Sequence, residues 1–187
     1  MSLPFHTIGH STRALGEFTG LLHESEIELL ADVRSIPRSR TNPQFNQETL
    51  PAFLGAEGIA YAHIAALGGR RGRRGGEPSP NGYWTHPAFR NYADYALGDA
   101  FDEGLSTLLG LGHGKRCAIM CSEAVWWRCH RRIVADYLLA RGETVLHIMA
   151  AHQVKPASLT PGAVLRPDGH VVYPAEGSTR GSTRGSG

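Results

Sequence analysis

The segment CAIMCSEAVWWRCHRRIVADYLLARG, residues 117–142, contains the pattern that best predicts the fold. Its first residues, Cys117–Cys121, form an apolar run of strand length without strict alternation, which is typical of a strand buried on both faces. A polar loop follows. Apolar residues at helical spacing then extend from Ile133 to Leu138, and Gly142 would end that helix. A strand, a loop and a helix in this order indicate one unit of an α/β sheet.

The same unit recurs along the chain. Four more apolar runs have the length of a buried strand, and they span Phe5–Gly9, Ile27–Val33, Ile59–Ile64 and Thr144–Met149. Helical patterns separate the runs, at Leu15–Leu22, Leu50–Leu54, Phe89–Ala96 and Phe101–Leu109. This alternation predicts a single-domain open parallel sheet flanked by helices.

Residues with known preferences for helix ends predict the helix boundaries. The predicted boundaries are a cap at Ser11 or Thr12 for the first helix, an end at Gly55 or Gly58 for the second, a start at Thr85 with Pro87 in the first turn for the third, and a stop at Gly110 and Gly112 for the fourth.

The end of the chain and one internal stretch differ from this pattern. Val164–Tyr173 predicts a β-hairpin around Pro-Asp-Gly. Residues 176–187 repeat Gly-Ser-Thr-Arg without an apolar side chain, so we expect an α/β domain over residues 1–175 and a flexible tail over residues 176–187. Leu67–Asn81 contains the four arginines of the Arg70–Arg74 segment and is long for a loop, so we expect it to be functional or mobile.

The composition limits the class of protein. The chain has 187 residues, of which 41% are hydrophobic and 19% are charged, as in a folded globular domain. No apolar run approaches the roughly 20 residues of a membrane helix, and the first residues lack the pattern of a signal peptide. The three cysteines are an odd number within 13 residues, which favours reduced thiols and a cytoplasmic location.

Arginine dominates the basic residues, because only Lys115 and Lys155 among the 19 are lysine. Arginine binds phosphate and carboxylate groups in a planar, bidentate manner, so the bias favours an anionic ligand. An arginine-rich proteome would produce the same bias. The net charge of +2 does not discriminate between partners, and nothing in the sequence indicates the oligomeric state.

Polar side chains follow each predicted strand. Ligands of open α/β sheets bind beyond the carboxyl ends of the strands, so we expect these side chains to converge at one edge. The residues expected to take part in catalysis are His10, Asp32, Cys121 and Glu123. The residues expected to bind the ligand are Ser11, Arg34, Arg38, Arg40, Arg70, Trp127, Arg128, His130 and Arg131.

Several phrases of the sequence resemble the domain of unknown function 488 family. These phrases are Thr7–Thr12, Asp32–Pro37, Gly58–Tyr61 with Leu67–Gly69, Phe89–Ala93, Met120–Glu123 and Trp127–Arg132. The resemblance covers roughly residues 5–175. It supports the predicted fold and the choice of site residues, but the family name implies no reaction.

Cys121 and Glu123 are alternative reactive groups at the end of the fourth predicted strand. A helix start, with Arg128 and Arg131, would lower the pKa of the Cys121 thiol and favour a nucleophile. The Cys121-to-Arg128 spacing is one residue longer than that of cysteine phosphatases. Glu123 could act as a general base or a nucleophile, and we favour it over Cys121. The structural alternatives are a small buried thiol and a carboxylate at a helix start.

The remaining candidates also have structural alternatives. His10 would act as an acid or orient the ligand, and Asp32 would either take part in catalysis or form a structural ion pair with Arg34. A triad of Ser11, His130 and Asp32 lacks the Gly-x-Ser-x-Gly motif.

No metal or cofactor is expected. Cys117, Cys121, Cys129 and His130 do not have a standard zinc spacing. Neither a Walker A motif nor a Gly-x-Gly-x-x-Gly motif is present, so ATP and NAD binding have no support.

The pairs Tyr83-Trp84 and Trp126-Trp127 lie near arginine clusters, and we expect one member of each pair to be buried and the other exposed. Aromatic faces beside arginines can stack on bases and hold phosphates. We therefore expect an enzyme, a hydrolase or a transferase, that acts on an anionic, phosphate-bearing ligand such as a nucleotide or a nucleic-acid component, with no membrane partner. The alternative is a non-catalytic module that binds nucleic acid or regulates another protein through the same residues.

Overall fold

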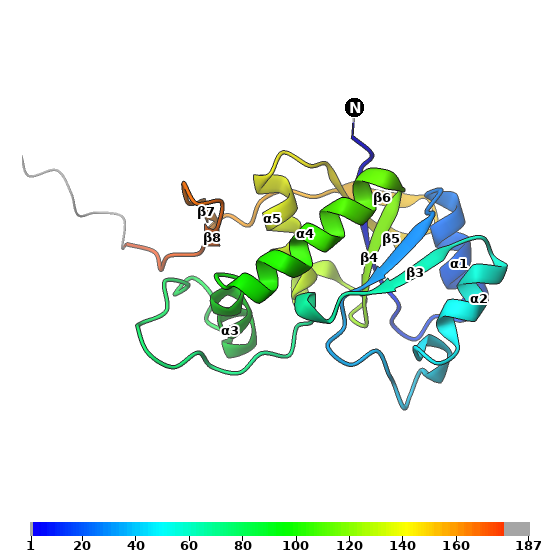
Figure 1. Ribbon diagram of the computed structural model, residues 1–187, viewed down its shortest axis with the longest axis horizontal. Coiled ribbons are helices and arrows are strands. Elements are labelled where there is room, and N and C mark those ends of the chain that lie inside the picture. The colour runs from blue at the N-terminus through cyan, green and yellow to red at the C-terminus, as the bar shows by residue number, and fades with distance from the viewer. Residues whose placement is uncertain (1, 178–187) are drawn as a thin grey trace, which may run out of the picture.

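A computed structural model describes residues 2–177 and contains a six-stranded sheet with helices on both faces (Figure 1). The strand order is β3-β2-β4-β1-β5-β6. The strands are β1 (Phe5–Gly9), β2 (Leu29–Asp32), β3 (Ala60–His63), β4 (Cys117–Cys121), β5 (Val145–Ala150) and β6 (Gln153–Pro156). Strands β1 to β5 are parallel, which confirms the predicted α/β class, and each predicted run overlaps one of them.

Strand β6 was not predicted. It pairs antiparallel with β5 at the edge of the sheet, so the sheet is mixed rather than wholly parallel. All four of its residues are exposed, and it therefore has no apolar run that could reveal it in the sequence.

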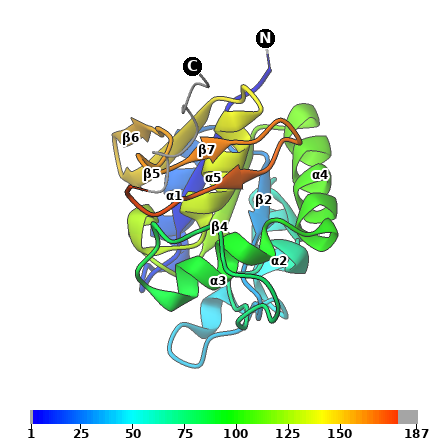
Figure 2. The same ribbon diagram turned by 90° about the vertical axis from the view of Figure 1, so that its left-hand side faces the viewer.

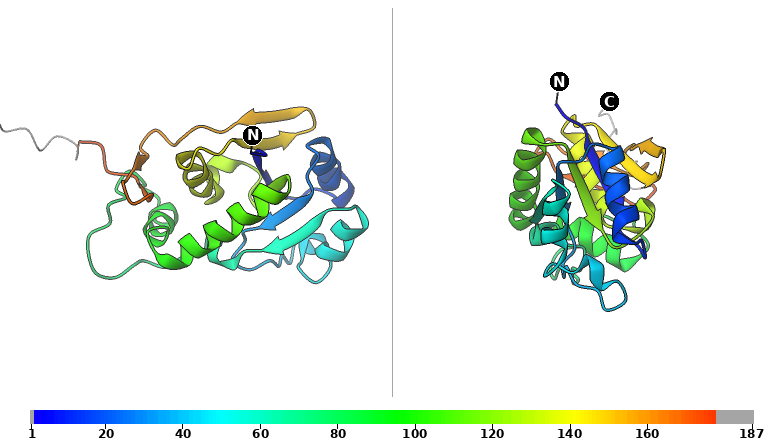
Figure 3. Two further views of the ribbon diagram at one scale, coloured as in Figure 1. Left: turned by 45° about the horizontal axis from the view of Figure 1, so that its top comes forward. Right: turned by 90° about the vertical axis from the view of Figure 1, so that its right-hand side faces the viewer.

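The helices form two layers around the sheet. They are α1 (Leu15–Glu24), α2 (Leu50–Ala56), α3 (Pro87–Tyr95), α4 (Asp99–Gly114) and α5 (Arg131–Ala140). Helices α1 and α2 pack on the strand face that includes Met120, whereas α3, α4 and α5 pack on the face that includes Ile119 and Cys121. Figure 3, right, shows α1 in blue and α4 in green on opposite sides of the sheet.

Several predicted helix boundaries are wrong. Helix α1 begins at Leu15, and neither Ser11 nor Thr12 caps it. The side chain of His86, not that of Thr85, caps α3 by accepting a hydrogen bond from the Ala88 N–H. Pro87 does occupy the first turn of α3 as predicted, and α2 ends between the two predicted glycines.

Two glycines that were expected to stop α4 lie inside it. A Cβ atom on Gly112 would lie 2.1 Å from the Phe5 ring. Gly112 therefore allows α4 to pack closely against β1, and tertiary packing outweighs the low helix propensity of glycine here.

The predicted C-terminal hairpin is confirmed as β7 (Val164–Leu165) and β8 (Val171–Val172), which pair antiparallel. It lies over α5 (Figure 2), and the Tyr173 hydroxyl, just after β8, donates a hydrogen bond to Asp136 of α5 at 2.8 Å. The predicted tail, from residue 178 onward, lies outside the described residues. Between residues 2 and 177, no helix combines the length and the apolar character needed to cross a membrane.

Candidate functional site

A cleft of about 1010 Å³ lies beyond the carboxyl ends of β1, β2 and β4. The segments that follow these strands line it, together with Gly69-Arg70 and the start of α3. All the predicted site residues except Asp32 and Arg131 contribute to this lining. The parallel sheet thus brings together side chains from distant parts of the sequence.

Asp32 lies beneath the cleft and is fully buried. It forms a bidentate ion pair with Arg34, with Nε–Oδ1 and Nη2–Oδ2 distances of 2.9 and 2.6 Å, and it also accepts a hydrogen bond from the Tyr61 hydroxyl. These contacts occupy both carboxylate oxygens, so Asp32 has no access to a ligand. The structural ion pair with Arg34, which was the alternative interpretation of Asp32, is present, whereas a catalytic role of Asp32 stays a prediction.

His10 supports Arg34 from the cleft side. Its Nδ1 lies 2.8 Å from the Ser11 carbonyl oxygen, and its Nε2 lies 3.3 Å from Nη1 of Arg34. Burial lowers the pKa of His10 to about 4, so the ring is neutral near neutral pH and Nε2 accepts from the guanidinium. This arrangement favours a role for His10 in orienting Arg34. It argues against a role as a general acid, because the neutral ring has no extra proton to donate.

The loop after β4 folds closely over the end of β1. A Cβ atom on Gly9 would lie 1.8 Å from the Glu123 carbonyl oxygen, so only glycine fits there. The backbone N–H of Ser11 donates to the Ser122 carbonyl oxygen at 3.0 Å. Ser11 has a φ of 49° and takes part in this turn rather than in capping α1.

Arg131, in the first turn of α5, is also buried beneath the cleft. Its Nη1 donates to Cys121 Sγ at 2.6 Å and to the Glu123 carbonyl oxygen at 2.6 Å. Its Nη2 donates to the Ala124 carbonyl oxygen at 3.1 Å. Arg131 therefore supports the β4–α5 loop from inside and does not line the cleft, and its role in holding a phosphate stays a prediction.

The thiols of Cys121 and Cys129 lie at the floor of the cleft. Burial raises the pKa of Cys121, which is the opposite of the predicted shift. Burial also acts to raise the pKa of Cys129, but a hydrogen bond from Cys121 and the charge of Arg131 outweigh it and lower that pKa. The more acidic thiol is thus Cys129, which the sequence indicated only as a poor metal ligand.

His130 lies between these thiols and the cleft wall. Its Nε2 lies 2.9 Å from the Val33 carbonyl oxygen, and its Nδ1 lies 3.5 Å from Cys129 Sγ. Burial lowers the pKa of His130, and a Cβ atom on Gly69 would lie 2.4 Å from Nδ1. The ring is therefore neutral and tightly enclosed.

Four arginines at the cleft are exposed, and three of them have no side-chain partner among the described residues. In the part of the chain that the structure describes, the side chains of Arg40, Arg70 and Arg128 form no ion pair or hydrogen bond, whereas Arg38 pairs with Glu48. Glu123 is also exposed, and it is the one carboxylate among the lining residues. The cleft is consequently cationic, apart from one carboxylate.

The aromatic pairs match the expectation in part, since each pair has one fully buried or fully exposed member and one intermediate member. Trp127 is 46% exposed at the cleft, while Trp126 is partly buried and stacks on His147 with a centroid distance of 4.5 Å. Trp84 is buried, and Tyr83 is partly exposed.

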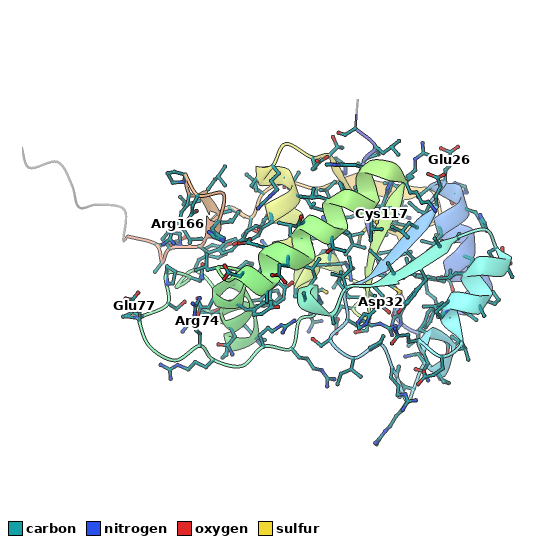
Figure 4. All side chains as sticks on the ribbon, viewed as in Figure 1. Glu26, Asp32, Arg74, Glu77, Cys117 and Arg166 are labelled. Atoms are coloured by element: carbon teal, nitrogen blue, oxygen red, sulfur yellow. The ribbon has the colours of Figure 1, made fainter. Side chains whose placement is uncertain are left out.

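The arginine-rich stretch divides into segments with different roles. Arg70 lines the cleft, and Arg71 instead covers the Tyr95 ring and donates to the carbonyl oxygens of Ala65 and Gly68. Arg73 and Arg74 line a second cleft of about 1370 Å³, together with Arg166. Figure 4 shows Arg74 and Arg166 far from Asp32, which marks the first cleft.

Comparison with known proteins identifies the family. The family model described as "Domain of unknown function DUF488" matches residues 14–138. The chain belongs to this family. No curated protein and no solved structure is significantly similar to the chain.

The DUF488 match defines which parts of the site belong to the family region. It includes the segments after β2 and β4 and the start of α5, but it begins after His10 and Ser11. Within residues 2–177, no three His, Cys, Asp or Glu side chains are grouped so that they could hold a metal ion.

Sequence reasoning missed several lining residues. His86 and Phe89 reach the cleft because α3 lies across its rim, and no sequence signal placed that helix there. Cys129 could have been found, because it directly precedes His130 and lies at the end of the same loop.

Proposed function

We propose that the protein binds an anionic, phosphate-bearing ligand, a nucleotide or a nucleic-acid component, in the cleft and acts on it as a hydrolase or transferase. The observation that carries this proposal is the set of three exposed, unpaired guanidinium groups at one opening, from Arg40, Arg70 and Arg128. The free thiols support a cytoplasmic setting.

The arginines favour a phosphate over a smaller anion. Guanidinium groups bind phosphate oxygens through bidentate hydrogen bonds, and these three come from different segments around the opening. A ligand that contacts all of them must present several anionic oxygens. A nucleotide or a short nucleic-acid segment meets this requirement.

Trp127 favours a ligand that also carries an aromatic ring. Its indole is 46% exposed beside Arg128, and the partly exposed ring of Phe89 lines the same cleft. Exposed aromatic faces stack on bases, typically contributing about 1–3 kcal/mol per base. A phosphate bound by the arginines would place a base within the same opening.

Glu123 is the group we propose for the chemistry. Its side chain is exposed at the cleft, where it could activate water or attack an electrophilic carbon. His10 and Arg34, which hold each other in place, would orient the ligand. The Cys121 thiol is less suited to the role because burial raises its pKa.

The competing function is a non-catalytic module that binds nucleic acid. The exposed arginines and Trp127 would serve it equally well. Product formation from a nucleotide favours the enzyme, whereas tight binding of a single strand without turnover favours the module.

A binding titration tests the proposal. Tryptophan fluorescence would be followed at low salt during additions of inorganic phosphate, a nucleoside monophosphate and a short single-stranded oligonucleotide. Arg70→Ala and Arg128→Ala should each weaken binding by about tenfold, because each removes one charge-assisted contact. Arg116→Ala is the matched control, since Arg116 precedes β4 at the opposite edge of the sheet. Absence of binding by the wild type, or equal weakening by Arg116→Ala, would overturn the proposal.

A further inference from the structure

Two cysteine sulfurs lie together at the floor of the cleft. Cys121 ends β4 and Cys129 precedes α5, and both line the cleft although both are buried. Arg131 donates hydrogen bonds to both sulfurs, and the Cys121 thiol itself donates to the Glu123 carbonyl oxygen at 3.9 Å. Cys117 begins the same strand but lies in the core at the far end of it (Figure 4), so it provides an internal comparison.

The charge of Arg131 has no carboxylate partner among the described residues. The side chain is 1% exposed, and its partners are two carbonyl oxygens and Cys121 Sγ. Its Nε is buried without any hydrogen bond. A buried cation is costly unless a negative charge lies nearby, and arginine cannot lose its proton in a protein.

The thiol pair can supply that negative charge. Arg131 reaches both sulfurs: Nη1 donates to Cys121 Sγ at 2.6 Å, and its backbone N–H donates to Cys129 Sγ at 3.5 Å. If the two thiols share one proton, the pair carries one negative charge against the guanidinium. The lowered pKa of Cys129 has the same physical origin.

We propose that Cys121 and Cys129 form a redox-active dithiol, which a hydroperoxide oxidises to an intramolecular disulfide and a small monothiol reduces again. The thiolate, its neighbouring thiol and the opening of the cleft are the three features that such a site requires. This site is independent of the proposed function, since it needs neither the exposed arginines nor Glu123.

The oxidation proceeds in two balanced steps. The Cys129 thiolate attacks the terminal oxygen of ROOH, so that an S–O bond forms, the O–O bond breaks, and RO⁻ leaves and takes a proton to become ROH. The Cys121 sulfur then attacks the resulting sulfenic sulfur. An S–S bond forms, and the hydroxyl group leaves with the remaining thiol proton as water. The sulfurs lose two electrons, which the hydroperoxide gains.

The buried guanidinium makes the disulfide easy to reduce. Oxidation removes the negative charge that Arg131 faces, whereas reduction restores it. A dithiol whose reduced form is stabilised in this way has an oxidising potential, so a monothiol such as glutathione is sufficient to reduce it.

The test uses the reduced full-length protein and one equivalent of hydrogen peroxide, followed by intact mass and peptide mapping. We expect the wild type to lose the mass of two hydrogen atoms, to link Cys121 to Cys129 within one chain, and to recover on addition of glutathione. Cys117→Ser, the matched control, should react identically. Cys121→Ser should stop at a sulfenic acid on Cys129, which dimedone would trap.

Other outcomes contradict the proposal. Oxidation of Cys117 at the same rate, a disulfide between two chains, or a stable sulfenic acid in the wild type would each overturn it. The wild-type peptide map decides the matter even if Cys121→Ser does not fold. Because no phosphate or nucleotide is added, a failure here leaves the binding titration unaffected.

Discussion

Arg34, in the lining of the cleft, and Arg131, beneath it, are both buried, but only Arg34 has a carboxylate partner among the described residues. Arg34 forms a bidentate pair with Asp32, which Tyr61 also contacts. Arg131 contacts two carbonyl oxygens and a thiol instead. The Arg34 site carries a fixed ion pair, because the guanidinium contacts both oxygens of the buried carboxylate. The Arg131 site faces groups whose charge depends on protonation and oxidation, so it can change state.

The largest expected effect is on the fixed pair. Asp32→Asn would leave Arg34 buried without a counter-charge, and we expect the free energy of unfolding to fall by about 3–5 kcal/mol. Urea denaturation would measure the loss. Glu26→Gln is the matched control, because it breaks the exposed pair with Arg116 and should cost less than about 1 kcal/mol. Equal losses in the two variants would mean that the Asp32–Arg34 pair is not structural.

A second prediction concerns Glu123, whose carbonyl oxygen Arg131 holds in place. Once a substrate is identified, Glu123→Gln should lower turnover by about 100-fold, equivalent to about 2.7 kcal/mol, because the amide cannot accept a proton. Cys121→Ser should cost less. Glu77→Gln, at the second cleft, is the control. A greater loss in Cys121→Ser would transfer the chemistry to the thiol.

A third prediction concerns the neutral histidines beside the two arginines. Burial lowers the pKa of His10 to about 4, and burial together with the charge of Arg131 lowers the pKa of His147 to about 4. Between their ordinary value of 6.5 and 4, the unfolded chain binds protons that the folded chain does not. The free energy of unfolding should therefore fall as the pH falls through this range and should be unaffected by these groups above it.

The histidine prediction is measured by urea denaturation at several pH values. His10→Asn and His147→Asn should each reduce the loss measured between about pH 7 and pH 5 by about 2 kcal/mol. His6 and His130, whose pKa values burial also lowers, would supply the loss that remains in a double variant. An unchanged pH profile in both single variants would show that neither ring is kept neutral by the fold.

Features that depend on local sequence could be predicted, whereas features that depend on tertiary contacts could not. Buried strands such as β1 and β4 are visible because a short apolar run between turn residues, too short for a helix, favours a buried strand. The convergence of strand ends follows from parallel pairing, so most cleft residues could be predicted. The burial of individual side chains could not be predicted. The sequence places Asp32 and Arg131 at this edge of the sheet, but it does not show that both lie beneath the surface of the cleft.

The proton state of the thiols was unpredictable for a related reason. A helix start and nearby arginines were expected to lower the pKa of Cys121, but its burial opposes them more strongly. Both sulfurs are buried only in the folded chain, in which the path of the loop runs closely over β1. That path depends on the close approach at Gly9, which is a tertiary contact.

The smallest expected effect on stability comes from Arg131→Met, and it distinguishes the two arginines most clearly. Removing the Asp32 carboxylate leaves the Arg34 guanidinium buried without a counter-charge, and arginine cannot lose its proton. Removing Arg131 leaves thiols that can regain a proton and become neutral. The carbonyl oxygens of Glu123 and Ala124 belong to a loop that lines the cleft, where water can replace the lost donors. The free energy of unfolding should therefore change by only about 1 kcal/mol.

The pKa of Cys129 should rise in Arg131→Met, which iodoacetamide alkylation across a pH series would report as an inflection at higher pH. Cys117 should be alkylated slowly in both proteins, because burial raises its pKa to about 12. A loss of stability as large as that of Asp32→Asn, with no movement of the inflection, would show that Arg131 is a structural anchor and that the thiols do not balance its charge.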